Sequence, residues 1–250
     1  MGYTIAVAGK GGTGKTTLAS LLVRLIKEDK KGGILAVDAD PNSNLAESLG
    51  VVISRSVGSI IDELAANPAK IPSGVPKERA VEYEIQTAVY EGDGFDILSM
   101  GRPEGPGCYC YANNVLRNIV SKLVNDYSYV IIDNEAGFEH LSRRTSRFAD
   151  VLLVVSDPTP AGLRAAERIS VLAKELKIGS GRNLLVLNRC KAERGGQGVS
   201  VRGLDYIGCI PDDPEITDIS VKGASLLGIS PGALSLNTLR RIGDKIWQRD

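Results

Sequence analysis

The segment that most constrains this chain is the glycine-rich stretch AVAGKGGTGKTTLA, residues 6 to 19. It follows an apolar run of strand length and leads into a helical pattern. Gly9, four further residues and then Gly14-Lys15-Thr16 match the P-loop spacing. In a P-loop, backbone N–H groups turn around phosphate oxygens, the lysine reaches the β- and γ-phosphates, and the hydroxyl ligates Mg²⁺. The sequence therefore predicts a phosphate site at the end of its first strand.

Apolar runs of strand length alternate with helical patterns along the rest of the chain. Most of these runs are continuously apolar, which is typical of a parallel sheet covered on both faces. This order predicts an α/β fold with a single doubly wound, mostly parallel sheet and helices on both faces, as one domain over residues 1–250. The expected strands are Thr4–Ala8, Ile34–Val37, Phe95–Ser99, Tyr129–Asp133, Val151–Val155, Leu184–Asn188 and Tyr206–Ile210. The expected helices are Thr16–Lys27, Ser56–Ala66, Asn113–Asn125, Thr159–Lys177 and Leu234–Gln248, with surface helix and loop over Ala69–Asp93.

Charge and composition exclude several partners. The 250 residues carry a formal net charge of zero and no block of clustered lysine and arginine, so no nucleic-acid partner is expected. The N-terminal apolar segment is too short for a signal peptide or a membrane span. We therefore expect a cytoplasmic protein, in which the four cysteines are thiols or metal ligands rather than disulfides.

A second lysine, Lys10, lies inside the glycine loop, where the phosphate chemistry does not need it. It is either a solvated surface charge or a lysine supplied in trans to the phosphates of a second subunit. The spelling GKGGTGKT resembles the deviant Walker A family of ATPases, which are nucleotide-gated dimers. The resemblance implies ATP or ADP as the ligand and assigns nucleotide binding to the whole loop, namely Gly9, Lys10, Gly11, Gly12, Thr13, Gly14, Lys15, Thr16 and Thr17.

Carboxylates follow two of the expected strands. Asp38 and Asp40, in VDADPN, either cap the next helix or form the family's switch I. In the second interpretation Asp40 positions the attacking water and Asp38 supports Mg²⁺ or the P-loop. Asp133 ends the strand YVIID and has a Walker-B-like placement in the magnesium shell, with the switch II segment following over residues 134–140. We expect Thr16, Asp38 and Asp133 to hold Mg²⁺ directly or through water.

The adenine base is assigned to two later loops. Asn188 matches the family's adenine-reading asparagine in its NR motif, and Arg189, the second residue of that motif, is assigned to nucleotide binding with it. The asparagine amide offers a donor and an acceptor together, as an adenine edge requires. Pro211 and Asp212, in CIPDDPE, are expected to wall the base.

Cys108 and Cys110, in GPGCYCY, lie in a loop rich in glycine and proline. One intervening residue is a poor match to a redox dithiol, and two ligands are too few for a zinc site in one chain. Two chains of a dimer supply four thiolates, a tetrahedral site suited to Zn²⁺, an iron–sulfur cluster or a nickel ion. Two unremarkable loop thiols are the remaining possibility. Cys190 and Cys209, near strand ends, are expected to be buried, inert thiols.

The segments RPEGPGCYC and DNEAGFEHLSRRT resemble the CooC-type nickel-insertion ATPases of carbon monoxide dehydrogenase, across essentially the whole chain. The resemblance implies an ATPase with Lys10, Lys15 and Asp40 in catalysis. It further implies a homodimer formed on nucleotide or metal binding, with Ni²⁺ or Zn²⁺ bridged by Cys108 and Cys110. The client would be a nickel enzyme, either carbon monoxide dehydrogenase or acetyl-CoA synthase.

Two other functions stay open. A positioning ATPase of the septum-site or partition type needs a membrane-binding helix or a basic DNA surface. The C-terminal stretch LSLNTLRRIGDKIWQRD could lie on a membrane, although packing on the sheet is the expectation, so membrane binding is not expected. An iron–sulfur scaffold or electron-transfer ATPase uses the same bridging thiolates with a different metal.

Overall fold

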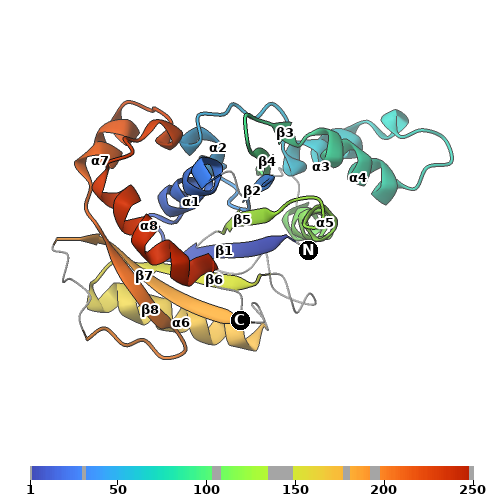
Figure 1. Cartoon of the computed structure of the whole chain (residues 1–250). Helices are drawn as coiled ribbons and strands as arrows, with labels where there is room; N and C mark the ends of the chain where they lie inside the picture. Colours follow the sequence, from blue (N-terminus) through green and yellow to red (C-terminus); the bar gives the residue numbers. More distant parts are fainter. Residues whose placement is uncertain are drawn as a thin grey trace.

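The fold is built on one eight-stranded sheet (Figure 1). The computed structural model describes residues 2–29, 32–102, 108–134, 149–176, 181–191 and 198–247. Within these residues the strand order is β3-β4-β2-β5-β1-β6-β7-β8; only the β3–β4 pair is antiparallel. The strands are β1 Tyr3–Gly9, β2 Ile34–Asp38, β3 Tyr90–Glu91, β4 Asp96–Ser99, β5 Tyr129–Asp133, β6 Val151–Ser156, β7 Arg182–Cys190 and β8 Asp205–Pro211.

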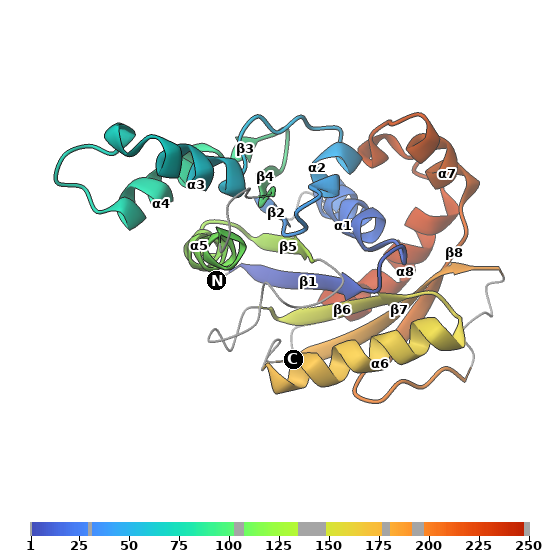
Figure 2. The ribbon, with the colours of Figure 1, turned by 180° about the vertical axis from the view of Figure 1, so that it is seen from behind.

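Helices cover both faces of this sheet. Helices α1 and α8 lie over one face and α6 lies over the opposite face, as both views show (Figures 1 and 2). The helical segments are α1 Lys15–Asp29, α2 Asn44–Ser48, α3 Val57–Ala66, η1 Pro68–Lys70, α4 Lys77–Thr87, α5 Cys108–Leu123, α6 Pro160–Glu175, α7 Pro214–Val221, η3 Leu226–Gly228 and α8 Leu234–Trp247.

The first strand shows why the sheet is covered twice. Ile5 and Val7 pack into the core formed with α1 and α8, whereas Ala6 and Ala8 pack into the core formed with α6. Successive side chains of a strand point to opposite faces, so a continuously apolar strand needs a cover on each side. The predicted doubly wound α/β fold is confirmed.

Most of the expected helices and strands are present, and side-chain hydrogen bonds at the first turn explain where two of the helices begin. Thr159 caps α6 by accepting the N–H of Gly162 at 3.0 Å, and Ser56 forms a capping box with Ser59 at the start of α3. The expectation of surface helix and loop over Ala69–Asp93 is incomplete. This segment contains helix α4, whose inner side is buried, and the short edge strand β3.

We expected the C-x-C segment to lie in a loop, but the structure shows it in a helix. Helix α5 spans Cys108–Leu123, so it begins five residues before the helix predicted from Asn113. Apolar periodicity becomes visible only after Asn113, and the first turn of the helix carries no apolar stripe that could reveal it. Cys108 and Cys110 therefore belong to the first turn of a helix.

The C-terminal helix packs on the sheet, as predicted. The side chains of Leu236, Leu239 and Ile246 are fully buried, and the Tyr3 hydroxyl donates to the Ile246 carbonyl at 2.6 Å. Arg240 pairs with Glu28 of α1 at 2.7 Å on the outer side. None of the described helices has the length and apolar character that crossing a membrane requires.

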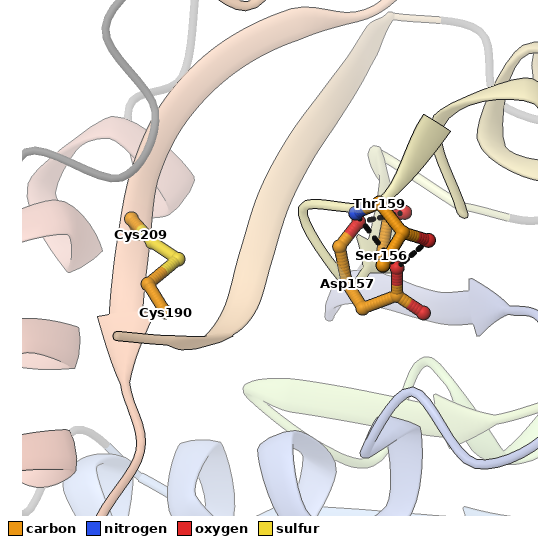
Figure 3. The surroundings of a disulfide bond; sticks show 5 residues. All are labelled: Ser156, Asp157, Thr159, Cys190 and Cys209. Atoms are coloured by element: carbon orange, nitrogen blue, oxygen red, sulfur yellow. Dashed lines mark hydrogen bonds between the residues drawn. A yellow bond between two sulfur atoms is a disulfide. The ribbon is translucent and has the colours of Figure 1, made fainter. Parts of the chain in front are cut away.

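Cys190 and Cys209 are not separate thiols, which corrects our expectation for this pair. They are joined as a disulfide between the neighbouring strands β7 and β8, with Cα atoms 6.3 Å apart (Figure 3). That separation lies inside the range in which a bridge forms without backbone movement. Parallel strands that follow each other in the chain lie side by side here, which brings together cysteines 19 residues apart.

Candidate functional site

The glycine loop between β1 and α1 has the backbone of a phosphate cradle. Gly12 and Gly14 adopt φ angles of 79° and 91°, which residues with a Cβ rarely tolerate. Thr13 closes the turn, since its hydroxyl donates to the Lys10 carbonyl at 2.8 Å. Lys15 is buried at the start of α1, whereas Lys10 is exposed. The first N–H groups of α1 and its positive dipole end point into the same loop.

Asn188 is tied to this loop. Its amide nitrogen donates to the Thr13 carbonyl at 2.9 Å, and a Cβ on residue 14 would collide with that amide. Glycine is thus required at position 14 for two reasons: the Asn188 amide packs closely against the loop there, and the backbone has a positive φ angle. One N–H of this amide is engaged with the loop, so its second N–H and the side-chain oxygen are left to face a base.

A pocket of about 470 Å³ opens beside Asn188. Asn188 and Arg189 from the end of β7 form one wall, and Pro211 and Asp212 from the end of β8 form the other, with Thr17 from α1. The structure thus brings all the residues assigned to the base to one pocket. Helix α7 supplies further lining that sequence reasoning missed, namely Ile216, Thr217, Ser220 and Val221.

Three predicted metal residues meet at the carboxyl ends of neighbouring strands. Asp38 on β2 is in register with Asp133 on β5, so the two carboxylates stand side by side. The Thr16 hydroxyl donates to Asp133 Oδ2 at 2.6 Å, which joins the P-loop helix to this pair. Asp38 accepts the N–H of Leu45, in the first turn of α2, at 2.9 Å. The capping role considered for this segment is therefore performed by Asp38.

The electrostatics of this pair fit a divalent cation. Burial, and next the charge of Asp133, raise the pKa of Asp38 to about 7. Burial raises the pKa of Asp133 to about 6, while the Thr16 hydrogen bond and the Lys15 charge act in the opposite direction. Oδ1 of Asp133 is buried without any hydrogen-bond partner in the described part of the chain. Two buried carboxylates with an open oxygen are the ligands that Mg²⁺ prefers.

The loop after β2 is held in a specific conformation. Asp40 Oδ1 accepts the backbone and side-chain N–H groups of Asn42, both at 2.9 Å, and Asp40 is partly exposed. Ser43 adopts a left-handed φ of 54°, and its hydroxyl contacts that of Ser99 on β4 at 2.8 Å. This loop is therefore linked to the strand that precedes the cysteine helix.

Asp157, at the end of β6, is a charged residue of the site that sequence reasoning missed. A hydrogen bond from Thr159 lowers its pKa, and the positive charges of Lys10 and Arg189 add to that effect. Asp157 thus offers a negative partner to Lys10 within the same chain. The signal that could have found it is its position, because ligands of such sheets gather where strands end.

Comparison with known proteins places this site in a family. The AAA domain family matches residues 2–184, which is more than half of the chain. The chain belongs to the AAA domain family of P-loop ATPases. An uncharacterised ATP-binding protein of Methanocaldococcus jannaschii is 41% identical over 97% of both chains. The carbon monoxide dehydrogenase accessory protein CooC of Rhodospirillum rubrum is 28% identical over 96% of this chain and 97% of its own.

The fold of this ATPase has counterparts among solved structures. The septum site-determining protein MinD of Pyrococcus horikoshii, complexed with Mg-ADP, superposes with a TM-score of 0.70. The match covers 99% of this chain and 97% of that one at 20% identity. At this identity the likeness shows the shared fold.

Other predicted parts of the ATPase site lie outside the described residues. The switch II segment beyond Asn134 falls in the gap over residues 135–148. Asn134 itself is buried, and its amide donates to the Val7 carbonyl at 2.9 Å, which ties the start of that segment to β1. The backbone of Cys108 and Cys110 is described as helical; no metal-ligand cluster is found among the residues whose side chains the structure describes.

Proposed function

We propose that this ATPase is a nickel-insertion protein for a nickel enzyme, either carbon monoxide dehydrogenase or acetyl-CoA synthase. It works as a nucleotide-gated homodimer in the cytoplasm, with residues 1–250 forming one ATPase domain. The full-length similarity to CooC supports this proposal, because it covers both the P-loop and the C-x-C segment. The relative of higher identity carries no stated function beyond ATP binding and neither supports nor opposes it.

In this proposal the nucleotide lies along the carboxyl edge of the sheet. The phosphates occupy the glycine loop with Lys15, and the base occupies the pocket between Asn188 and Pro211. Thr16, Asp38 and Asp133 hold Mg²⁺, which neutralises phosphate charge when bound. Asp40 orients the attacking water, and the exposed Lys10 reaches the phosphates of the second subunit. Lys10 must then exchange its negative neighbour Asp157 for a phosphate when the dimer closes.

The observation that carries the proposal is the connection from this site to β4, the strand that precedes the cysteine helix in the chain. The loop of Asp40 contacts β4 through the Ser43–Ser99 hydroxyl pair. The next residue, Met100, donates its N–H to the Asp38 carbonyl at 2.8 Å. Ser99 and Met100, at the end of β4, are therefore held by the residues that would sense phosphate and Mg²⁺. In this proposal a nucleotide-dependent change in Asp38 or Ser43 acts on the end of β4, which precedes α5 in the chain.

The backbone of Cys108 and Cys110 forms the first turn of α5. Two such turns at a two-fold axis would supply the four thiolates of a tetrahedral site for Ni²⁺ or Zn²⁺.

The proposal is tested by equilibrium nickel binding to the reduced, Mg-ATP-loaded protein. The wild type should bind nickel, and Cys108→Ser should lose stoichiometric binding while its circular dichroism stays unchanged. Cys209→Ser, which removes a thiol outside the segment, is the matched control and should bind as the wild type does. Unchanged nickel content in Cys108→Ser would refute the assignment.

The two alternatives have their own readouts. A positioning ATPase shares the fold, but the apolar side of α8 that would meet a membrane is buried against the sheet. ATP-dependent sedimentation with anionic lipid vesicles would favour that alternative. An iron–sulfur scaffold would purify anaerobically as a brown protein with sulfur-to-iron absorption, and would replace nickel with iron in the proposal.

A further inference from the structure

The base pocket of this ATPase has a covalent feature that the proposed function does not use. We propose that Cys190 and Cys209 form a reversible disulfide that controls the nucleotide affinity of this pocket. The inference rests on the placement of the base in the pocket between Asn188 and Pro211, and it is independent of the nickel assignment.

The position of the two cysteines in the strand register carries the argument. Strands β7 and β8 pair Leu187 with Cys209 and Cys190 with Pro211, with a register irregularity between these two pairs. Asn188 and Arg189, which form one wall of the pocket, are the two residues inside that irregularity. Each flanking pair contains one of the cysteines, so their disulfide closes directly across the bulge.

The backbone inside the bulge has an unusual conformation. Arg189 adopts a left-handed φ of 56°, which is uncommon for a residue with a side chain. Beyond it, the Cys190 carbonyl accepts the N–H of Asp212 at 3.2 Å, which joins the two walls of the pocket once more. The disulfide adds a covalent link at this point and fixes the spacing of the walls. A preorganised pocket binds its ligand more tightly than one that must be ordered on binding.

The accessibility of the two sulfurs indicates the order of the reaction. Cys190 is buried at 3% exposure on the α6 side of the sheet, whereas Cys209 is partly exposed. The Cys209 thiolate attacks a low-molecular-weight disulfide RSSR, which forms a mixed disulfide and releases one RS⁻. The Cys190 thiolate then attacks the Cys209 sulfur and releases the second RS⁻. Two protein thiols are thereby oxidised, RSSR is reduced to two RSH, and the two thiol protons end on the RSH molecules.

The test compares Mg-ADP binding by calorimetry after oxidation with glutathione disulfide and after reduction with a phosphine. Trypsin digestion of the oxidised protein without reductant should give residues 190–191 cross-linked to residues 203–222. The oxidised protein should bind Mg-ADP roughly 5-fold more tightly than the reduced protein. Cys209→Ser and Cys190→Ser should each show one affinity, equal to that of the reduced wild type, in both conditions. The double variant Cys108→Ser/Cys110→Ser should keep the redox response.

The following results would overturn the inference. Equal affinities in a fully cross-linked and a fully reduced sample would overturn the inference, as would the absence of the 190–191/203–222 peptide. A redox response that survives in Cys209→Ser would assign the effect to other thiols and overturn it too. If Mg-ADP binds in neither state, the nucleotide site itself is wrong, and this inference falls with it.

Discussion

At the scale of single residues, the chemistry concentrates on Asp38 and Asp133. Both side chains are fully buried and in register on adjacent strands, and burial disfavours the charged form of each. Proteins retain such unfavourable arrangements where function requires them. In our proposal, the pair lowers the stability of the metal-free protein and in return gives it affinity for Mg²⁺.

The first prediction concerns the stability of the metal-free protein as a function of pH. The pKa of Asp133 in the folded state, about 6, lies above its ordinary value of 3.8. The folded state therefore binds this proton more tightly than the unfolded state. Its contribution to stability is fully present below pH 3.8 and is lost as the pH rises through about 6. Urea unfolding in EDTA should accordingly show lower stability at pH 8 than at pH 5.

Asp133→Asn should remove the part of this dependence that Asp133 contributes, while Asp38, whose pKa burial raises to about 7, keeps its own part. The asparagine oxygen can still accept the Thr16 hydroxyl, while the buried charge is gone. The variant should be about 2 kcal/mol more stable than the wild type at pH 8 and should bind Mg-nucleotide more weakly. Asp218→Asn, which removes an exposed carboxylate on α7, is the control and should match the wild type. An Asp133→Asn variant less stable than the wild type at pH 8 would contradict this account.

The second prediction separates the two lysines of the glycine loop. Lys10 is exposed and lies near Asp157 of its own chain, whereas Lys15 is buried in the loop. Lys10→Ala should lower ATP turnover by about 10³-fold and abolish nucleotide-dependent dimerisation, because it removes a charge supplied in trans. Mg-ADP affinity should stay within about 3-fold, since Lys15 still holds phosphate. Full turnover in Lys10→Ala, with Lys222→Ala as the exposed-lysine control, would count against a role in trans.

At the scale of secondary-structure elements, the coupling between the loop after β2 and helix α5 is the main feature. The buried Ser99 hydroxyl is the contact of β4 with Ser43, and Ser43 is held in a left-handed conformation. A loop residue in that conformation persists only where its surroundings hold it, so the contact defines one state of the loop.

The third prediction tests this coupling. Ser99→Ala removes the hydroxyl pair at a cost of about 1 kcal/mol in stability. ATP should still bind, but the increase in nickel affinity that ATP produces should shrink by at least about 5-fold. Ser121→Ala, which removes an exposed hydroxyl that donates to the Asn118 carbonyl of its own helix, should leave the increase unchanged. An unaltered ATP effect in Ser99→Ala would show that the signal takes another route.

The elements that could be predicted from the sequence are those with long apolar patterns. Seven of the eight strands in the described part of the chain follow from apolar runs, because a strand that is buried on both faces shows a continuous apolar run instead of polar alternation. The two-residue strand β3 and the short helices α2 and α7 were missed, since each is too short for a clear period. The start of α5 was missed because the glycine and proline before it favoured a loop.

At the scale of the whole molecule, the parallel sheet explains both what was predicted in the site and what was not. Every predicted nucleotide residue in the described segments lies at the carboxyl edge, where loops from different strands converge. Contacts between strands were harder to foresee. The Cys190–Cys209 bond, the effect of the Lys10 charge on Asp157 and the Ser43–Ser99 contact all depend on strand order and register, which a single sequence does not specify.

The central claim is that two chains, closed by ATP, share one nickel ion through four cysteines. Native mass spectrometry of the reduced protein with nickel and a non-hydrolysable ATP analogue tests it most directly, because it counts chains and metal in the same particle. The account predicts a dimer carrying one nickel ion with the analogue, and a metal-free dimer or monomer for Cys108→Ser. One nickel ion on each single chain, or a nucleotide-bound dimer of the wild type that carries none, would contradict it.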